Sequence, residues 1–469
     1  MNSSEQFKKY TEKVCDQIRW KNAHNMVKKE IENHLIDQKI AYMNMGDSES
    51  IAEEKALLQM GDPVEIGSAL DHTHKPIPQK SMIALVMLLV IVGMIIQYWL
   101  TVTCVNLDIN SGSIPYQFVM YGVGVFVLFA AYFLDFSFFS KHPYILFLSI
   151  IIIDILAQLF GTWYGGNRWL HLGPFSLSPS SVSLLFPLAF CSIYYQLRGK
   201  GTQGYLISGI FAVCCCAFLL TFHTMGGVVI FLCSAGILML IAAFKNWFGE
   251  KTKPLLLLFI IAFIICTCCL LLTPQVMYRL SHITAILHPE IDPAGAGYLS
   301  GILQNMIKNS VFWGEGTPFL NYDVTYAVML SNFRSDFLLT FLTYKYGWGA
   351  SITLILLLSM FIGIGFNKCL KQKSILGKTM SLSILCTFTV EILLYVISNL
   401  GYPIIAPIGL PFLSYGGTTL VIHMALTGIL LSTFRTGEVY QDKVKSVLND
   451  ETKFVQWDNG KLIITFKSL

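Results

Sequence analysis

One acidic residue of this chain stands in a setting suited to catalysis. The segment 288–298 carries Asp292, followed by Pro293 and by two glycines, Gly295 and Gly297. Proline fixes one backbone angle, whereas glycine allows turns that other residues resist, so the pattern presents a rigid carboxylate on a flexible platform. A carboxylate near low-dielectric surroundings has a raised proton affinity and can act as a general base. The alternative is a turn residue, because Asp-Pro is common in turns.

A second segment, 166–175, places Arg168 beside Trp169. The planar guanidinium of an arginine can pair with phosphate through two parallel hydrogen bonds. The alternative is that the pair only anchors the chain at a membrane interface, where tryptophan is enriched.

Two later segments complete the set of candidates. Asp336, in Arg334-Ser335-Asp336-Phe337, opens the next predicted helix, where it binds a substrate or only stabilises the helix dipole. The stretch 407–419 is rich in glycine and proline and includes Ser414, Tyr415, Gly416 and Gly417. Its amides cannot face lipid unpaired, so it lines a cavity or is buried in protein, and we favour the cavity.

Acids also occur inside apolar runs. Asp154 and Glu391 are costly in hydrocarbon, and such residues either pair with protein groups or line a polar cavity. We favour a structural, hydrogen-bonded role for both.

The composition of the 469 residues is that of a membrane protein. Hydrophobic residues make up 54% and charged residues only 13%, whereas a soluble domain carries about 25% charge. The net charge of +4 gives no case for nucleic acid. The twelve cysteines lie mostly inside apolar runs and lack the spacing of zinc ligands.

Apolar runs near the roughly 20 residues that cross a bilayer predict about ten transmembrane helices. They begin around Ser81, Gln117, Pro143, Ser178, Gln203, Met225, Pro254, Leu339, Met380 and Ser414. Lysine and arginine gather in alternate loops, and such basic loops face the cytoplasm. This topology puts both termini in the cytoplasm and the Asp292 loop outside. The fold class is therefore all-α and polytopic.

Soluble segments flank this membrane domain, which spans 79–435 and includes a large extracytoplasmic loop over 274–336. Residues 1–78 predict a cytoplasmic helical domain, with helical periodicity from Phe7 to Met45 and a capping box formed by Ser50 and Glu53. Gly61 ends that helix and Pro63 begins the next. The tail 436–469 predicts a hairpin around an Asn-Gly turn.

The segment 60–67 resembles the prefix domain found ahead of some bacterial permeases and sensors, which implies a regulatory or docking module. The alternative is a cytoplasmic cap without a partner.

The order of the motifs over 81–435 resembles the SEDS family, the RodA, FtsW and SpoVE group of shape, elongation, division and sporulation proteins. The matching motifs are Asn167-Arg168-Trp169 through Phe175, Pro289 to Tyr298, and Gly409 to Gly417.

The resemblance implies a ten-helix peptidoglycan glycosyltransferase of the bacterial cytoplasmic membrane, which polymerises lipid II outside the membrane and works with a class B penicillin-binding protein. Asp292 matches the family's essential loop acid and would deprotonate the acceptor hydroxyl. Arg168 would help to hold the pyrophosphate. Trp169, Tyr298, Asp336 and the 414–417 stretch are the other expected substrate-binding residues. A divalent cation beside the pyrophosphate is compatible with this chemistry, although no cluster of ligands specifies one.

The chain departs from the family pattern at several polar positions. Ser178-Pro179-Ser180-Ser181 replaces a Gln-Pro-Ser-Glu motif, and His223-Thr224-Met225-Gly226 replaces Pro-Asp-Leu-Gly, so that Thr224 stands where the family has an acid. Lys345-Tyr346 replaces a pair of glutamates. These losses leave two alternatives to the enzyme: a non-catalytic scaffold that recruits a cell-wall synthase, and a flippase of lipid-linked precursors.

Overall fold

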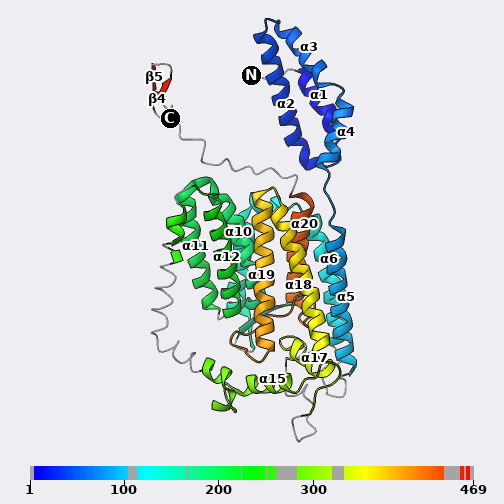
Figure 1. The fold of residues 1–469 in the computed structure, drawn as a ribbon, viewed down its shortest axis with the longest axis vertical. Helices are drawn as coiled ribbons and strands as arrows, with labels where there is room; N and C mark the ends of the chain where they lie inside the picture. The colour runs from blue at the N-terminus through cyan, green and yellow to red at the C-terminus, as the bar shows by residue number, and fades with distance from the viewer. Residues whose placement is uncertain are drawn as a thin grey trace. The chain divides into compact units, whose positions relative to one another are not determined.

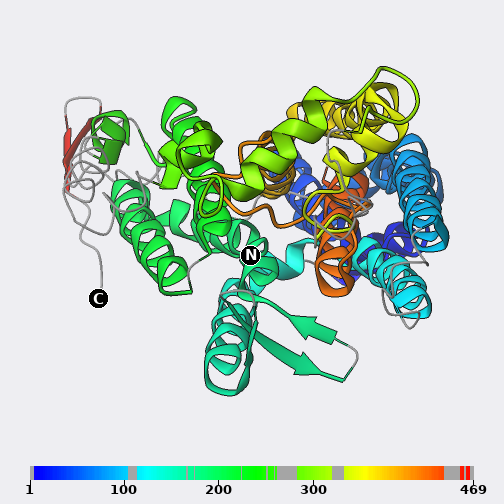
Figure 2. The same cartoon turned by 90° about the horizontal axis from the view of Figure 1, so that it is seen from below.

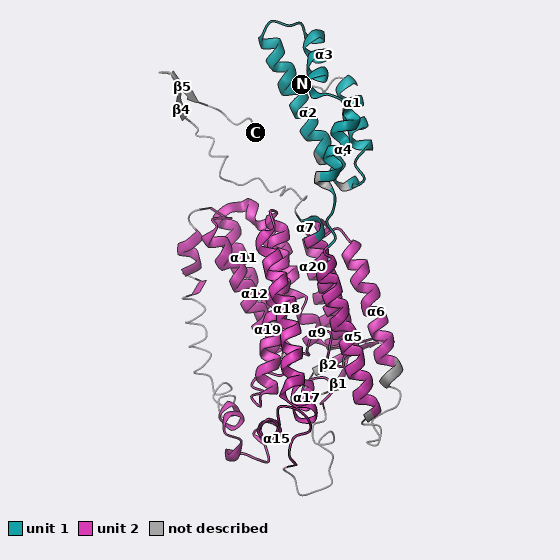
Figure 3. Cartoon of the chain, turned by 45° about the vertical axis from the view of Figure 1, so that its right-hand side comes forward, with its two compact units in different colours: residues 1–78, 435–441 teal, residues 79–434, 442–469 magenta. Residues whose placement is uncertain are grey.

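The computed structural model describes most of the chain, and its content is chiefly helical (Figure 1). The described residues are 5–103, 113–164, 167–173, 175–222, 224–249, 252–257, 259–260, 282–318, 332–437, 455–458 and 461–464. They divide into two compact units, Met1–Pro78 with Arg435–Gln441, and Gln79–Phe434 with Asp442–Leu469 (Figure 3).

The N-terminal unit is a small four-helix domain with its own apolar core. Its helices are α1 (Glu5–Asp16), α2 (Lys21–Asn44), α3 (Glu49–Met60) and α4 (Pro63–His74). The core is formed by side chains at helical spacing, including Phe7, Val14, Val27, Ile31 and Leu35. Burial of such side chains, at roughly 1.5–3 kcal/mol each, is what holds short helices together.

Two details of this unit correct the sequence analysis. The periodic stretch from Phe7 to Met45 is two helices, because the chain turns between Asp16 and Lys21, where the Arg19 amide donates to the Asp71 carboxylate at 2.9 Å. The predicted capping box is wrong as well. Helix α3 begins one residue before Ser50, and Glu53 instead accepts from Lys39 at 3.2 Å. The predicted end at Gly61 (φ +89°) and the start at Pro63 are confirmed.

The second unit is a bundle of long apolar helices. It contains α5 (Lys80–Thr103), α6 (Ser113–Phe133), α7 (Ser137–Lys141), α8 (Pro143–Phe160), α9 (Pro179–Ser183), α10 (Phe186–Leu197), η2 (Arg198–Lys200), α11 (Gly201–Thr221), α12 (Met225–Phe244), η3 (Pro289–Ile291), α15 (Tyr298–Lys308), α17 (Leu338–Tyr346), α18 (Trp348–Lys371), α19 (Ile375–Asn399) and α20 (Gly417–Thr436).

Eight segments among the described residues are long and apolar enough to span a membrane. One of them, Pro179–Thr221, has 43 residues and is interrupted at Gly201 (φ +59°), so it exceeds the length of a single span. The predicted span near Pro254 lies largely outside the described residues. The polytopic helical class is confirmed. Helix α19 packs against α10, α12 and α18, and α20 is the most enclosed of the described spans.

The span predicted to begin near Leu339 begins later. A short helix, α17, ends at Tyr346, and the chain bends at Gly347 (φ +91°) before the span α18 starts at Trp348. An apolar composition runs through both helices, so hydrophobicity alone did not reveal the break.

Short strands were not predicted inside the membrane domain. Strands β1 (Thr162–Tyr164), β2 (Asn167–Leu172) and β3 (Phe175–Leu177) form an antiparallel sheet in that order. Figure 2 shows strands of this sheet, drawn in blue-green, standing out to one side of the bundle. The predicted hairpin of the tail is confirmed, with β4 (Val455–Asp458) antiparallel to β5 (Lys461–Ile464).

Candidate functional site

Asp292 is held on a compact turn at the end of the bundle opposite the start of α5. It follows η3 and precedes α15, which lies across the ends of the long helices (Figure 1). Its Oδ2 accepts from the Ala296 amide at 2.8 Å, and its carbonyl accepts from the Gly297 amide at 3.1 Å. The side chain is exposed. The carboxylate is therefore both oriented by the backbone and open to a ligand.

The two glycines of this turn are required by close approach. A Cβ at Gly295 would lie 2.3 Å from Asp292 Oδ2. A Cβ at Gly297 would lie 2.8 Å from the carbonyl oxygens of both Asp292 and Pro289. Any side chain at these positions would displace the carboxylate or unfold the turn. Residues 289–297 are called the Asp292 platform below.

A cleft of about 420 Å³ adjoins the platform. Its lining combines platform residues with one face of α15, including Pro289, Glu290, Pro293, Tyr298, Gln304 and Asn305. Tyr298, which the sequence predicted as a substrate contact, is half exposed and borders this space. The volume is in the range of small-molecule sites.

Helix α15 ties the platform to the rest of the bundle. The Ser300 hydroxyl lies 2.5 Å from the Gly401 carbonyl, and the Gln304 amide donates to the same oxygen at 3.1 Å. Gly401 lies just after Leu400, the residue that caps α19, and a Cβ at Gly401 would lie 2.4 Å from Gln304 Cγ. The glycine therefore lets the two segments touch.

The second candidate segment, residues 407–417, is termed the frame loop. It is mostly buried, and its polar groups bond to protein. Ser414 Oγ accepts from the Leu410 amide and donates to the Ser335 carbonyl, both at 2.8 Å. The Tyr121 hydroxyl donates to the Phe412 carbonyl at 2.9 Å, and Phe412 adopts φ +68°. The expectation that this loop lines a cavity holds only for a small void of about 10 Å³.

Arg334 connects the frame loop to α5. Its guanidinium donates to Thr101 Oγ1 at 2.8 Å and lies 4.7 Å from the centre of the Tyr415 ring. Gln97 donates to the carbonyls of Arg334 and Leu413 at 3.2 and 2.9 Å. Sequence reasoning missed Gln97, although an amide inside an apolar run is a signal of such a contact.

Asp336 lies in the turn before α17 rather than in the helix. Its Oδ2 accepts from the Asn332 side-chain amide at 3.1 Å, and its carbonyl accepts from Asn399 at 2.9 Å. Burial raises the pKa of this carboxyl to about 6, and its hydrogen bonds from Ser335 and Asn332 oppose that rise. A carboxyl with such a pKa exchanges protons near neutral pH.

Arg168 sits in the small sheet, on β2 opposite Trp163. Its guanidinium donates to the carbonyl of Gln158, near the end of α8. Trp169 pairs with Thr162 in the same sheet and is partly buried. Among the described residues, no hydrogen bond or ion pair joins Arg168 to the Asp292 platform.

The helix α20 connects the sheet to the frame loop. The Thr418 hydroxyl donates to the Ser176 carbonyl at 2.8 Å, and the Thr419 and Ser181 hydroxyls lie 2.5 Å apart. Gly417 begins this helix, and a Cβ there would lie 2.3 Å from the Tyr116 hydroxyl oxygen. Ser181 stands where an acid was expected, so a hydroxyl contact replaces a charge at this position.

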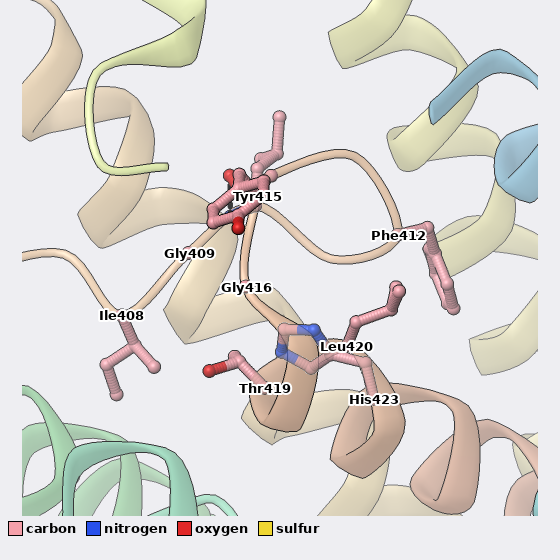
Figure 4. A pocket seen from close by; sticks show the side chains of 10 residues that line it. Ile408, Gly409, Phe412, Tyr415, Gly416, Thr419, Leu420 and His423 are labelled. Carbon is pink, nitrogen blue, oxygen red and sulfur yellow. Dashed lines mark hydrogen bonds between the residues drawn. The ribbon is translucent and has the colours of Figure 1, made fainter. Parts of the chain in front are cut away.

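A buried pair of side chains, His423 and Glu391, lies beneath the frame loop. His423 Nε2 lies 2.9 and 3.0 Å from the two oxygens of Glu391, and both side chains are about 98% buried. His423 also lines the small void, together with frame-loop residues such as Gly409 and Gly416 (Figure 4). The hydrogen-bonded role expected for Glu391 is confirmed. Asp154 differs, because its Oδ1 is buried and has no hydrogen-bond partner among the residues that the structure describes.

Hydrogen bonds thus connect three of the four candidate segments. The fourth, the Asp292 platform, is attached at the edge of this group. Ser335, Ser414 and Thr418 link the segments around Asp336, the frame loop and the sheet. Among the described residues, the platform is tied to the rest of the bundle through α15, which bonds to Gly401. Within the described ranges, no three His, Cys, Asp or Glu side chains gather as a metal-ligand set.

Comparisons with known proteins agree with this architecture. A family model for cell cycle proteins, named for FtsW, RodA and SpoVE, matches residues 79–437. A probable peptidoglycan glycosyltransferase FtsW from Acinetobacter baylyi is 27% identical over 318 residues, which cover 65% of this chain and 76% of the relative. The stage V sporulation protein E of Bacillus subtilis is 22% identical, over 77% of this chain and 98% of the relative.

Two solved structures share the fold. A chain from a peptidoglycan synthase complex superimposes with a TM-score of 0.60 at 19% identity, covering 76% of this chain and 98% of the other. RodA from Thermus thermophilus gives a TM-score of 0.51 at 17% identity, covering 78% and 98%. At these identities the likeness establishes the fold alone.

Proposed function

This chain belongs to the FtsW, RodA and SpoVE family of cell cycle proteins, and we propose that it is a peptidoglycan glycosyltransferase that polymerises lipid II. Family membership and the apolar helices make it a multi-pass protein of the bacterial plasma membrane. The observation that carries the proposal is the exposed Asp292 carboxylate, oriented by the Ala296 amide beside a cleft of about 420 Å³.

In the proposed reaction Asp292 is the general base. Its carboxylate takes the proton of the acceptor sugar hydroxyl as that oxygen attacks the anomeric carbon of the donor. The bond from the anomeric carbon to the pyrophosphate breaks, and undecaprenyl pyrophosphate leaves. General-base catalysis of this kind contributes about 10²- to 10⁴-fold in rate.

Basic residues support the orientation that we propose for the chain in the membrane. Lys368 and Lys371 lie at the end of α18 that contacts Gln79, at the start of the bundle, whereas α15, which follows Asp292, lies across the other end (Figure 1). Because basic residues favour the cytoplasmic side, we place both termini in the cytoplasm and Asp292 outside.

The experiment is lipid II polymerisation by the purified full-length protein, alone and with a class B penicillin-binding protein. We expect Asp292→Ala to remove product, whereas Glu315→Gln, an exposed acid of the same loop outside the cleft, retains it. Equal product from wild type and Asp292→Ala would overturn the assigned role.

A non-catalytic scaffold is the second candidate. The scaffold is favoured by the contacts of two arginines that would otherwise be candidates to bind pyrophosphate. Arg168 donates to the Gln158 carbonyl, and Arg334 is buried against Thr101 and Tyr415, so both guanidinium groups are held by protein. If the wild type yields no polymer with or without a synthase partner, yet binds that partner, the scaffold is correct.

We also propose that the N-terminal helical unit is a docking or regulatory module. It has a core of its own, which a covalently linked module needs in order to fold independently. Deletion of residues 1–78 should leave membrane insertion intact and alter localisation or partner binding. Loss of insertion would show that the unit is structural.

A further inference from the structure

Three consecutive apolar side chains stand exposed in the loop that follows α15. Val311, Phe312 and Trp313 expose 36%, 59% and 70% of their surface. The two rings contact each other edge to face, with centroids 5.3 Å apart. Exposed apolar surface of this kind marks an interaction site when it is contiguous.

This loop is bonded to the first turn of a membrane span. The amides of Trp348 and Gly349 donate to the carbonyls of Val311 and Phe312, each at 3.0 Å. These amides open α18 and have no partner inside the helix. A Cβ at Gly349 would lie 2.5 Å from the Trp313 indole, so glycine lets that ring lie against the helix. The aromatic pair is therefore fixed at the level where α18 begins.

The length of α18 gives that level. Lys368 marks the end of the apolar stretch, and Trp348 precedes it by 20 residues. At about 1.5 Å per residue this is about 30 Å, the thickness of the hydrocarbon core. Trp348, and with it the aromatic pair, falls at the opposite boundary between hydrocarbon and headgroups.

Charged groups lie beside this apolar segment. Glu315, in the loop, forms an ion pair at 2.7 Å with Lys345, on α17, and both side chains are partly exposed. The loop thus combines an apolar edge with a charged one, which is the arrangement of interfacial segments.

We propose that Val311, Phe312 and Trp313 insert into the lipid of the leaflet on the Asp292 side and anchor α15 to the membrane surface. Helix α15 then connects two fixed points, because its first turns bond to Gly401 and its end leads into the anchor. The occupant is lipid because the patch is bonded to the first residues of α18, a helix long and apolar enough to span a membrane, whose first turns expose Ile352. This inference does not depend on the proposed glycosyltransferase activity.

Tryptophan fluorescence in nanodiscs tests the position of this anchor in the intact protein. The chain has eight tryptophans, and the difference between wild type and Trp313→Phe isolates the emission of Trp313 from that of the others. We expect phosphatidylcholine brominated near the glycerol end of its acyl chains to remove most of that emission, and aqueous iodide to leave it. The emission lost in Trp348→Phe is the matched control for a tryptophan at a span boundary. The emission lost in Trp20→Phe is the control for a tryptophan in the separate helical unit.

Two results would overturn the proposal. Quenching by iodide without an effect of brominated lipid would place the loop in water. Shielding from both quenchers would mean that protein covers it, for example a partner chain. A gain-of-signal variant guards against an ambiguous difference: Phe312→Trp in the Trp313→Phe background should restore lipid-quenchable emission, and a failure to do so counts against insertion.

Discussion

The Asp292 platform and the frame loop are both built from proline and glycine, but they are bonded in opposite ways. The platform makes its hydrogen bonds within itself and leaves its carboxylate exposed. The frame loop is enclosed, and its groups bond to α5, α6, α19 and the turn before α17. Changes to the platform should therefore alter activity with little effect on stability, whereas changes beneath the frame loop should do the reverse.

The largest effect on stability is expected at the buried pair. His423→Ala leaves the Glu391 carboxylate enclosed without its imidazole partner, and breaking such a pair costs about 3–5 kcal/mol. Thermal unfolding in detergent should show a marked fall in Tm. The double variant Glu391→Leu with His423→Phe removes both polar groups and should recover much of that loss. If His423→Ala is as stable as wild type, the buried pair beneath the frame loop does not stabilise the fold, and the contrast with the platform is wrong.

The next effect is on activity and concerns Gly295. An alanine there places a methyl group against Asp292 Oδ2, so Gly295→Ala should turn the carboxylate away and lower the polymerisation rate by about 10²-fold, the lower end of a general base's contribution. Its Tm should change little. Gly363→Ala is the matched control, because no atom lies within 4 Å of the added Cβ. A Gly295→Ala enzyme with normal rate would contradict the importance of the platform geometry.

The smallest effect concerns Asp336, which lies in the turn before α17, beside the residue that bonds to the frame loop. Its pKa is raised by burial to about 6 from an ordinary value of 3.8, so the folded state holds a proton that the unfolded state releases. Stability should therefore decline as pH rises from about 4 to about 6 and stay at the lower value above it. After allowance for solvent screening we expect about 1 kcal/mol.

Asp336→Asn removes this titration. Its Tm relative to wild type should be higher at pH 7 than at pH 4, when both proteins are compared in the same detergent. A Tm difference that is independent of pH would show that the carboxyl has an ordinary pKa in the folded state.

The sequence predicted the class of fold and the candidate segments because apolar runs and glycine-proline motifs are local signals. It did not predict the break at Gly347, where composition stays apolar on both sides, or the small sheet around Arg168. It also did not predict which polar groups meet. The Glu391 partner, His423, lies on another helix 32 residues away, and such pairing depends on the packing of the bundle.

The structure also shows what surrounds Ser181, one of the positions where the sequence departs from the family pattern. Ser181, where the family resemblance predicted an acid, instead has its hydroxyl 2.5 Å from that of Thr419.

The central claim is tested most directly by measuring the lipid II polymerisation rate and Tm on the same preparations of wild type, Asp292→Asn and Glu315→Gln. We predict that Asp292→Asn loses at least about 10²-fold in rate while its Tm stays near that of wild type, and that Glu315→Gln keeps its rate. An Asp292→Asn protein that polymerises at the wild-type rate, or that loses product only because it unfolds, would contradict the role of Asp292 as the base.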